Sequence, residues 1–134
     1  MKNASFVFFI SVLMFSVMPL NASGASDVCN KVSKAIEAGN ARGVSQFFGT
    51  HVDLTLPGSD GTFSKNQAEL ILRDFFTKNA PRSFTVSHQG SSRDGSQYVI
   101  GQYVSRNNTS YRTYFLVKKV SGKMVLHQIQ FENR

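Results

Sequence analysis

The fold is decided by the stretch SKNQAELILRDFFTKNAP, which occupies residues 64–81. Ser64 and Gln67 have the spacing of a capping box, in which each side chain bonds to a free backbone N–H at the start of a helix. Pro81 ends the helix because its ring disfavours helical backbone in the preceding residue. The apolar side chains between them recur at helical spacing: Ala68, Ile71 or Leu72, Phe75 and Phe76. The stretch therefore predicts an amphipathic helix with one face to bury.

The chain after this helix has the pattern of consecutive β-strands. Four segments rich in Tyr, Phe, Val and Ile cover residues 83–89, 97–105, 110–120 and 123–131. Their connections are short and polar, and Asn107-Asn108 and Ser121-Gly122 are typical turn pairs. Connections of this length predict antiparallel neighbours.

Upstream of residue 64, the spacing of apolar residues predicts two further helices, a strand and a short strand stub. We expect helices over 26–38 and 41–48 and strands over 50–56 and 62–63. In the first strand, alternation turns Asp53 away from the apolar side. The whole pattern predicts an α+β fold: three N-terminal helices packed on a strongly curved, antiparallel, four- to six-stranded sheet. We expect the sheet to form a cone around the helix that begins at Lys65, with a pocket at its wide end.

Composition limits the chain to one small domain. Its 134 residues leave no room for two folded units. The single cysteine, Cys29, excludes a disulfide scaffold and a multi-thiolate metal site. It is either a buried small hydrophobe or a thiol open to intermolecular pairing, and packing is the favoured role.

The first residues have the order of a secretory signal peptide. Lys2 is followed by an apolar run from Phe6 to Leu20 and then by small residues up to Ala25. A membrane-spanning helix needs ~20 apolar residues, more than this run provides, and Asp27-Val28 is unsuited to lipoprotein cleavage before Cys29. We therefore expect a signal peptide over residues 1–25, cleavage near Ala25, a single domain over 26–134, a periplasmic or secreted location and no transmembrane anchor after cleavage.

Several stretches of the chain resemble a small family of secreted bacterial proteins, domain of unknown function 4783, within the nuclear transport factor 2-like (cystatin-like) superfamily. The resemblance covers nearly all of the mature chain and is most specific over residues 64–76. Further matching stretches are residues 35–40, 52–55, 81–84, 88–90, 98–101 and 111–112. The superfamily includes ketosteroid isomerases, polyketide cyclases and binding modules. The resemblance implies a cone-like fold and export, and it carries over no catalytic residue.

Candidate polar groups for a pocket wall come from the predicted strands. We select five of them: His88, Tyr103, Arg112, Tyr114 and His127. An isomerase-type base would be a carboxylate in an apolar pocket, and Asp53 is turned away from the apolar side. The three histidines have no metal-ligand spacing, so we predict neither a metal site nor a cofactor.

The basic balance, 15 Lys and Arg against 8 Asp and Glu, invites a nucleic-acid interpretation. Export and the scatter of the charges argue against it. The densest cluster is Lys118, Lys119 and Lys123 at a predicted hairpin tip.

We therefore expect a non-catalytic exported domain. It would bind a small apolar or amphipathic ligand in the cone, or pair as a homodimer through the open sheet face. The alternatives are an isomerase- or cyclase-like enzyme using the cone, and an envelope protein that docks on an anionic polymer.

Overall fold

The computed structural model describes residues 24–134. The signal peptide predicted for residues 1–25 therefore lies outside the described residues, apart from its last two positions. Within the described part, no helix has the length and apolar content needed to cross a bilayer.

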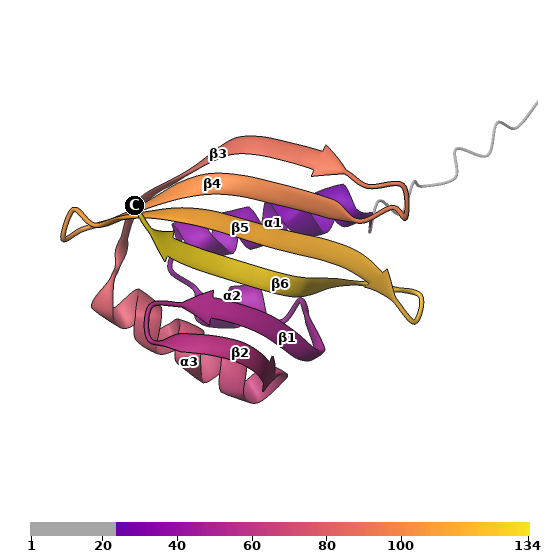
Figure 1. The fold of residues 1–134 in the computed structure, drawn as a ribbon, viewed down its shortest axis with the longest axis horizontal. Helices are drawn as coiled ribbons and strands as arrows, with labels where there is room; N and C mark the ends of the chain where they lie inside the picture. Colours follow the sequence, from indigo (N-terminus) through magenta and orange to yellow (C-terminus); the bar gives the residue numbers. More distant parts are fainter. Residues whose placement is uncertain (1–23) are drawn as a thin grey trace, which may run out of the picture.

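Three helices and six strands make up this part (Figure 1). In chain order they are α1 (Ala25–Glu37), α2 (Ala41–Ser45), β1 (Phe48–Leu56), β2 (Ser59–Ser64), α3 (Lys65–Lys78), β3 (Pro81–Ser91), β4 (Gln97–Ser105), β5 (Ser110–Val120) and β6 (Lys123–Asn133). The strands form one sheet in the order β2-β1-β6-β5-β4-β3. The α+β class, the three helices and a sheet of six strands agree with the sequence prediction.

The prediction of a purely antiparallel sheet is wrong at one pairing. β1 runs parallel to β6, whereas every other neighbouring pair is antiparallel. Short turns fix the direction of strands that are consecutive in the chain. β1 and β6 are separated in the chain by β2, α3 and three further strands, so no turn fixes their relative direction. The sheet is therefore a mixed one.

The second predicted helix is also too long. It ends at Ser45 instead of Phe48 because β6 recruits the following backbone into the sheet. The Leu126 N–H donates to the Phe47 carbonyl over 2.7 Å, and Phe48 pairs with Leu126. Phe48 is buried in the core, but as the first residue of β1.

The capping box at the start of α3 is present as predicted. The Gln67 N–H donates to the Ser64 hydroxyl over 3.3 Å, and the Gln67 side-chain oxygen accepts from the Ser64 N–H over 3.4 Å. Two free donors at the helix start are thereby satisfied. Pro81 begins β3 just past the helix, so the predicted end is correct within two residues.

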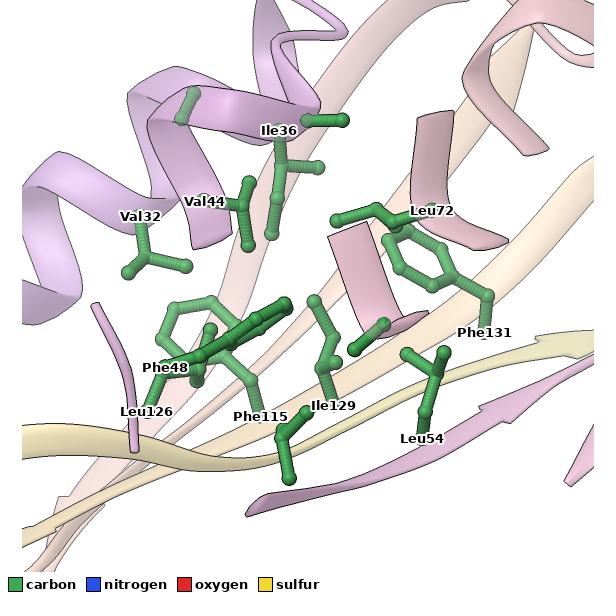
Figure 2. Close-up of a cluster of buried hydrophobic side chains, with 14 of the residues drawn as sticks. Val32, Ile36, Val44, Phe48, Leu54, Leu72, Phe115, Leu126, Ile129 and Phe131 are labelled. Carbon is green, nitrogen blue, oxygen red and sulfur yellow. The ribbon is translucent and has the colours of Figure 1, made fainter. Parts of the chain in front are cut away.

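All three helices cover the same face of the sheet, which we call the inner face. α1 packs against β3, β4, β5 and β6, and α3 packs against β1 and β2. Figure 2 shows Val32 and Ile36 of α1 directed into the same core as Phe115 and Ile129 of the sheet. The opposite face, which we call the outer face, carries none of the three helices of residues 24–134 (Figure 1).

The packing of α3 is tested by a matched pair of leucines on that helix. Leu72 is fully buried, whereas Leu70 is 62% exposed. We expect Leu72→Ala to lower the free energy of unfolding by about 2–5 kcal/mol, since it leaves a cavity in the core. Leu70→Ala should change it by less than about 0.5 kcal/mol. Urea unfolding followed by circular dichroism measures both, and equal losses would contradict the placement of α3.

Candidate functional site

The space between α3 and the sheet is filled by an aromatic cluster centred on Phe75. The Phe75 ring centroid lies 4.8 Å from that of Phe131 and 5.2 Å from that of Tyr111. The Tyr103 and Phe76 rings lie 5.8 and 5.9 Å from it. All five side chains are buried, and these separations are those of packed aromatic pairs. The space between Phe75 and the inner face of the sheet is therefore filled by core side chains.

Two tyrosine hydroxyls tie this cluster to the end of α3. Tyr103 donates to the Asn79 carbonyl over 2.5 Å, and Tyr111 donates to the Asn79 side-chain oxygen over 2.8 Å. Asn79 is the residue that ends α3. Burial, reinforced for Tyr103 by neighbouring Tyr111, raises the pKa of both hydroxyls above the ordinary value. Both groups are thus neutral donors that hold α3 against β4 and β5.

The five pocket candidates fall on both faces of the sheet. Tyr103 belongs to the inner face and is part of the core. His88 and Tyr114 both flank Ile100 in register and lie on the outer face, as does exposed Arg112 beside Gln102. The structure therefore brings His88, Tyr114 and Arg112 to one surface and separates Tyr103 from them.

His127 lies at an irregularity of β6, where the register with β5 shifts. Its Nε2 atom lies 3.9 Å from a carboxylate oxygen of Asp53, and both side chains are partly exposed. The other Asp53 oxygen accepts from the Thr62 hydroxyl over 2.6 Å. Asp53 thus faces away from the core, as its place in the alternating pattern predicted.

A buried acid is not found in the described part of the chain. Every Asp and Glu of residues 24–134 is half-buried or exposed, and no three His, Cys, Asp or Glu side chains of those residues gather as metal ligands would. Cys29 is 2% exposed, and its burial raises the pKa of the thiol to about 11. The packing role expected for Cys29 is therefore confirmed.

The outer face has an apolar centre that we call the outer patch, formed by Tyr98, Ile100, Tyr114 and Leu116. Tyr98 pairs with Leu116 and Ile100 with Tyr114, so the four make two adjacent rows across β4 and β5. The two tyrosine rings stack at a centroid distance of 6.5 Å with 24° between their planes. The Tyr98 ring covers Gly90 on β3, where a Cβ would lie 2.7 Å from the ring, so a larger residue at this position would displace the end of the ring.

Polar side chains surround the outer patch. Gln102, Arg112 and Glu132 form the next row across β4, β5 and β6. Gln128 and Gln130 of β6 pair with Leu116 and Tyr114 on the other side. An apolar centre rich in tyrosine inside a polar rim is the usual anatomy of a protein interface.

A second surface feature lies at the end of the β5–β6 hairpin. Two neighbouring recesses share Phe47, Lys123 and Met124, and we call them together the lysine groove. The larger has a volume of about 550 Å³ and the smaller about 440 Å³. Of the predicted lysine cluster, the groove contains Lys119 and Lys123 but not Lys118, and α3 adds Lys65. The sequence offered no link between Lys65 and the hairpin, because they are far apart in the chain.

Comparison with known proteins gives a family model and several solved structures. Residues 29–132 match the model described as "Domain of unknown function (DUF4783)". A DUF4783 family protein from Bacteroides ovatus ATCC 8483 is 33% identical with a TM-score of 0.71, over 78% of this chain and 93% of that one. One from Bacteroides uniformis ATCC 8492 is 32% identical with a TM-score of 0.72, over 78% and 95%. Among curated proteins, none matches the chain.

More distant structures agree in fold alone. An NTF2-like protein of unknown function from Burkholderia xenovorans LB400 is 14% identical with a TM-score of 0.62, over 82% of this chain and 84% of that one. The fold of this chain is therefore also similar to that of nuclear transport factor 2-like proteins outside the family.

Because the buried tyrosine hydroxyls are held in the neutral form, we expect the free energy of unfolding to fall at high pH. In the unfolded chain a tyrosine deprotonates near 10.0, whereas the folded state holds the Tyr103 proton to higher pH. The stability that the neutral Tyr103 hydroxyl contributes is therefore fully present below pH 10 and is lost as the pH rises above this value. We expect Tyr103 to account for about 1 kcal/mol of the fall in unfolding free energy between pH 9 and 11. Urea titrations at both pH values measure this fall.

Two variants isolate the effect. Tyr103→Phe should make the fall with pH shallower and also cost about 1 kcal/mol at neutral pH, because the Asn79 carbonyl loses its partner. Tyr98→Phe, on the outer face, is the matched control and should keep the wild-type slope. An unchanged slope in Tyr103→Phe would show that this hydroxyl is not held in the core.

Proposed function

The chain belongs to the DUF4783 family, and from this premise we propose that it is an exported, non-catalytic interaction domain that works as a homodimer paired through the outer patch. The observation that carries the proposal is an apolar, tyrosine-rich centre on a sheet face that none of the helices in residues 24–134 covers. We also propose that the sheet is curved into a cone-like form. In this form the hollow of the cone holds the aromatic face of α3 and not a ligand.

The register of the outer patch supports pairing with a second copy. A two-fold axis along the strands between β4 and β5 would set Ile100 opposite Tyr114 of the second copy and Tyr98 opposite its Leu116. Each contact then occurs twice, as a two-fold interface requires. The same axis sets Gln102 opposite Arg112, so the polar row also finds hydrogen-bonding partners. Face-to-face packing of two sheets in this manner is a common arrangement.

The placement of the acidic side chains favours binding over catalysis. An isomerase- or cyclase-type reaction needs a carboxylate held in an apolar pocket, where desolvation tunes its pKa. In residues 24–134 every carboxylate is half-buried or exposed, and the space around Phe75 is packed with aromatic rings. A ligand held deep in the cone finds no support for the same reason.

A substitution within the outer patch tests the pairing. Leu116→Arg adds a charge at the centre of the proposed interface, where burying it without a partner is unfavourable. We expect the wild-type protein to sediment as a dimer and Leu116→Arg to raise the dimer dissociation constant about tenfold or more, equivalent to at least ~1.4 kcal/mol. Sedimentation velocity over a concentration series measures this. The protein is produced from the full chain in an exporting host.

Leu70→Arg is the matched control because Leu70 is an exposed leucine on the helix side of the molecule. It should dimerise as the wild type does. A wild-type protein that stays monomeric throughout the series, or a Leu116→Arg variant that dimerises normally, would disprove pairing through the outer patch.

Export is tested separately by the processed N-terminus. We expect protein recovered from the periplasm or medium of an exporting host to begin at Ser26, or at Ala25 if cleavage follows Gly24. N-terminal sequencing and intact mass distinguish these cuts. Full-length protein that stays in the cytoplasm with Met1 in place would contradict export.

A further inference from the structure

The lysine groove lies where three separate segments meet. The β5–β6 hairpin forms one wall, the link between α2 and β1 another, and the first residue of α3 closes the edge. Phe47 and Met124 form its floor and are both half-buried. They lie outside the fully buried core, so the groove offers apolar surface that residues 24–134 leave partly uncovered.

The charge of the groove is entirely positive. Lys123 lines both recesses, whereas Lys65 lines only the larger one and Lys119 only the smaller one. Among residues 24–134, no Asp or Glu lines either recess. Within residues 24–134, the ion pairs use Lys31 and Lys78 but none of these three lysines. Uncompensated charge of one sign around a recess raises the local concentration of the opposite ion.

The size and lining of the groove fit a small amphiphile. About 550 Å³ lies within the range of small-ligand sites, which is ~300–1,000 Å³. Met124 is a flexible side chain that adapts to a chain-like ligand. Val120 and Val125 extend the apolar surface along the hairpin. A free inorganic anion would use the lysines and leave this floor in water, whereas a bilayer surface would not enter a recess.

We propose that the lysine groove binds a single-chain amphiphile with an anionic head, such as a fatty acid. The carboxylate lies beside Lys123, which lines both recesses, and Lys65 and Lys119 add positive charge from one recess each. The alkyl chain lies along Phe47 and Met124. This site is separate from the outer patch. It therefore goes beyond the proposed pairing function and does not depend on it.

Three probes separate the contribution of the anionic head from that of the alkyl chain. Decanoate has both a carboxylate and a long alkyl chain, 1-decanol has the alkyl chain without the charge, and acetate has the carboxylate without the long alkyl chain. We expect decanoate to bind saturably, with a dissociation constant at least about tenfold lower than that of 1-decanol or acetate. NMR chemical shifts or calorimetry measure this binding. Added salt should weaken decanoate binding, because exposed charge pairs are screened. Equal affinity for decanoate and 1-decanol would overturn the proposal.

Charge-removing variants locate the site. We expect Lys65→Gln, Lys119→Gln and Lys123→Gln each to weaken decanoate binding about 2- to 5-fold, as exposed ion pairs do. Their effects should combine in the triple variant, and Lys123→Arg should retain the wild-type affinity. Lys34→Gln is the matched control, since Lys34 is exposed on α1 outside the groove, and it should bind as the wild type does. A triple variant with unchanged affinity would overturn the proposal.

Two further arms separate this proposal from its alternatives. Leu116→Arg should bind decanoate as the wild type does, whether or not the protein dimerises, so failure of one proposal leaves the other measurable. Phosphatidylglycerol vesicles test docking on an anionic membrane. Vesicle binding without saturable binding of decanoate would overturn the groove proposal in favour of a membrane surface.

Discussion

The structure depends on the contact between the aromatic face of α3 and the inner face of the sheet. Phe75 packs at once on Tyr103, Tyr111 and Phe131, which come from three neighbouring strands. The two hydroxyls bonded to Asn79 set where the helix ends against those strands. A helix held by rings and by two partly buried hydrogen bonds has one favoured position, because moving it would leave these polar groups without their partners.

The same packing fills the space between Phe75 and the inner face of the sheet with core side chains. Both proposals therefore concern surfaces, and these two surfaces have distinct chemistry. The outer patch is apolar and uncharged at its centre, which suits a second copy, whereas the lysine groove combines apolar floor with unpaired positive charge. The two proposed sites share no residue, so each can be tested without the other.

Local features of this chain could be predicted from sequence, and non-local ones could not. The capping box at Ser64, the end of α3 before Pro81 and the outward direction of Asp53 follow from short-range rules and are present. The parallel pairing of β1 with β6 and the early end of α2 depend on contacts between distant segments, which no local pattern encodes.

The site candidates show the same division. Tyr103 and Arg112 were placed in one wall because both lie on predicted strands, although the apolar alternation of Tyr111, Phe115 and Val117 already turns Arg112 outward. The packed ring cluster is the central feature of this fold, and xenon tests it directly because the gas enters apolar cavities that proteins leave empty. A crystal structure under xenon pressure should contain no xenon among the rings of Phe75, Tyr103, Tyr111 and Phe131. A xenon atom between the Phe75 ring and any of these three rings would reveal a cavity there and contradict the account.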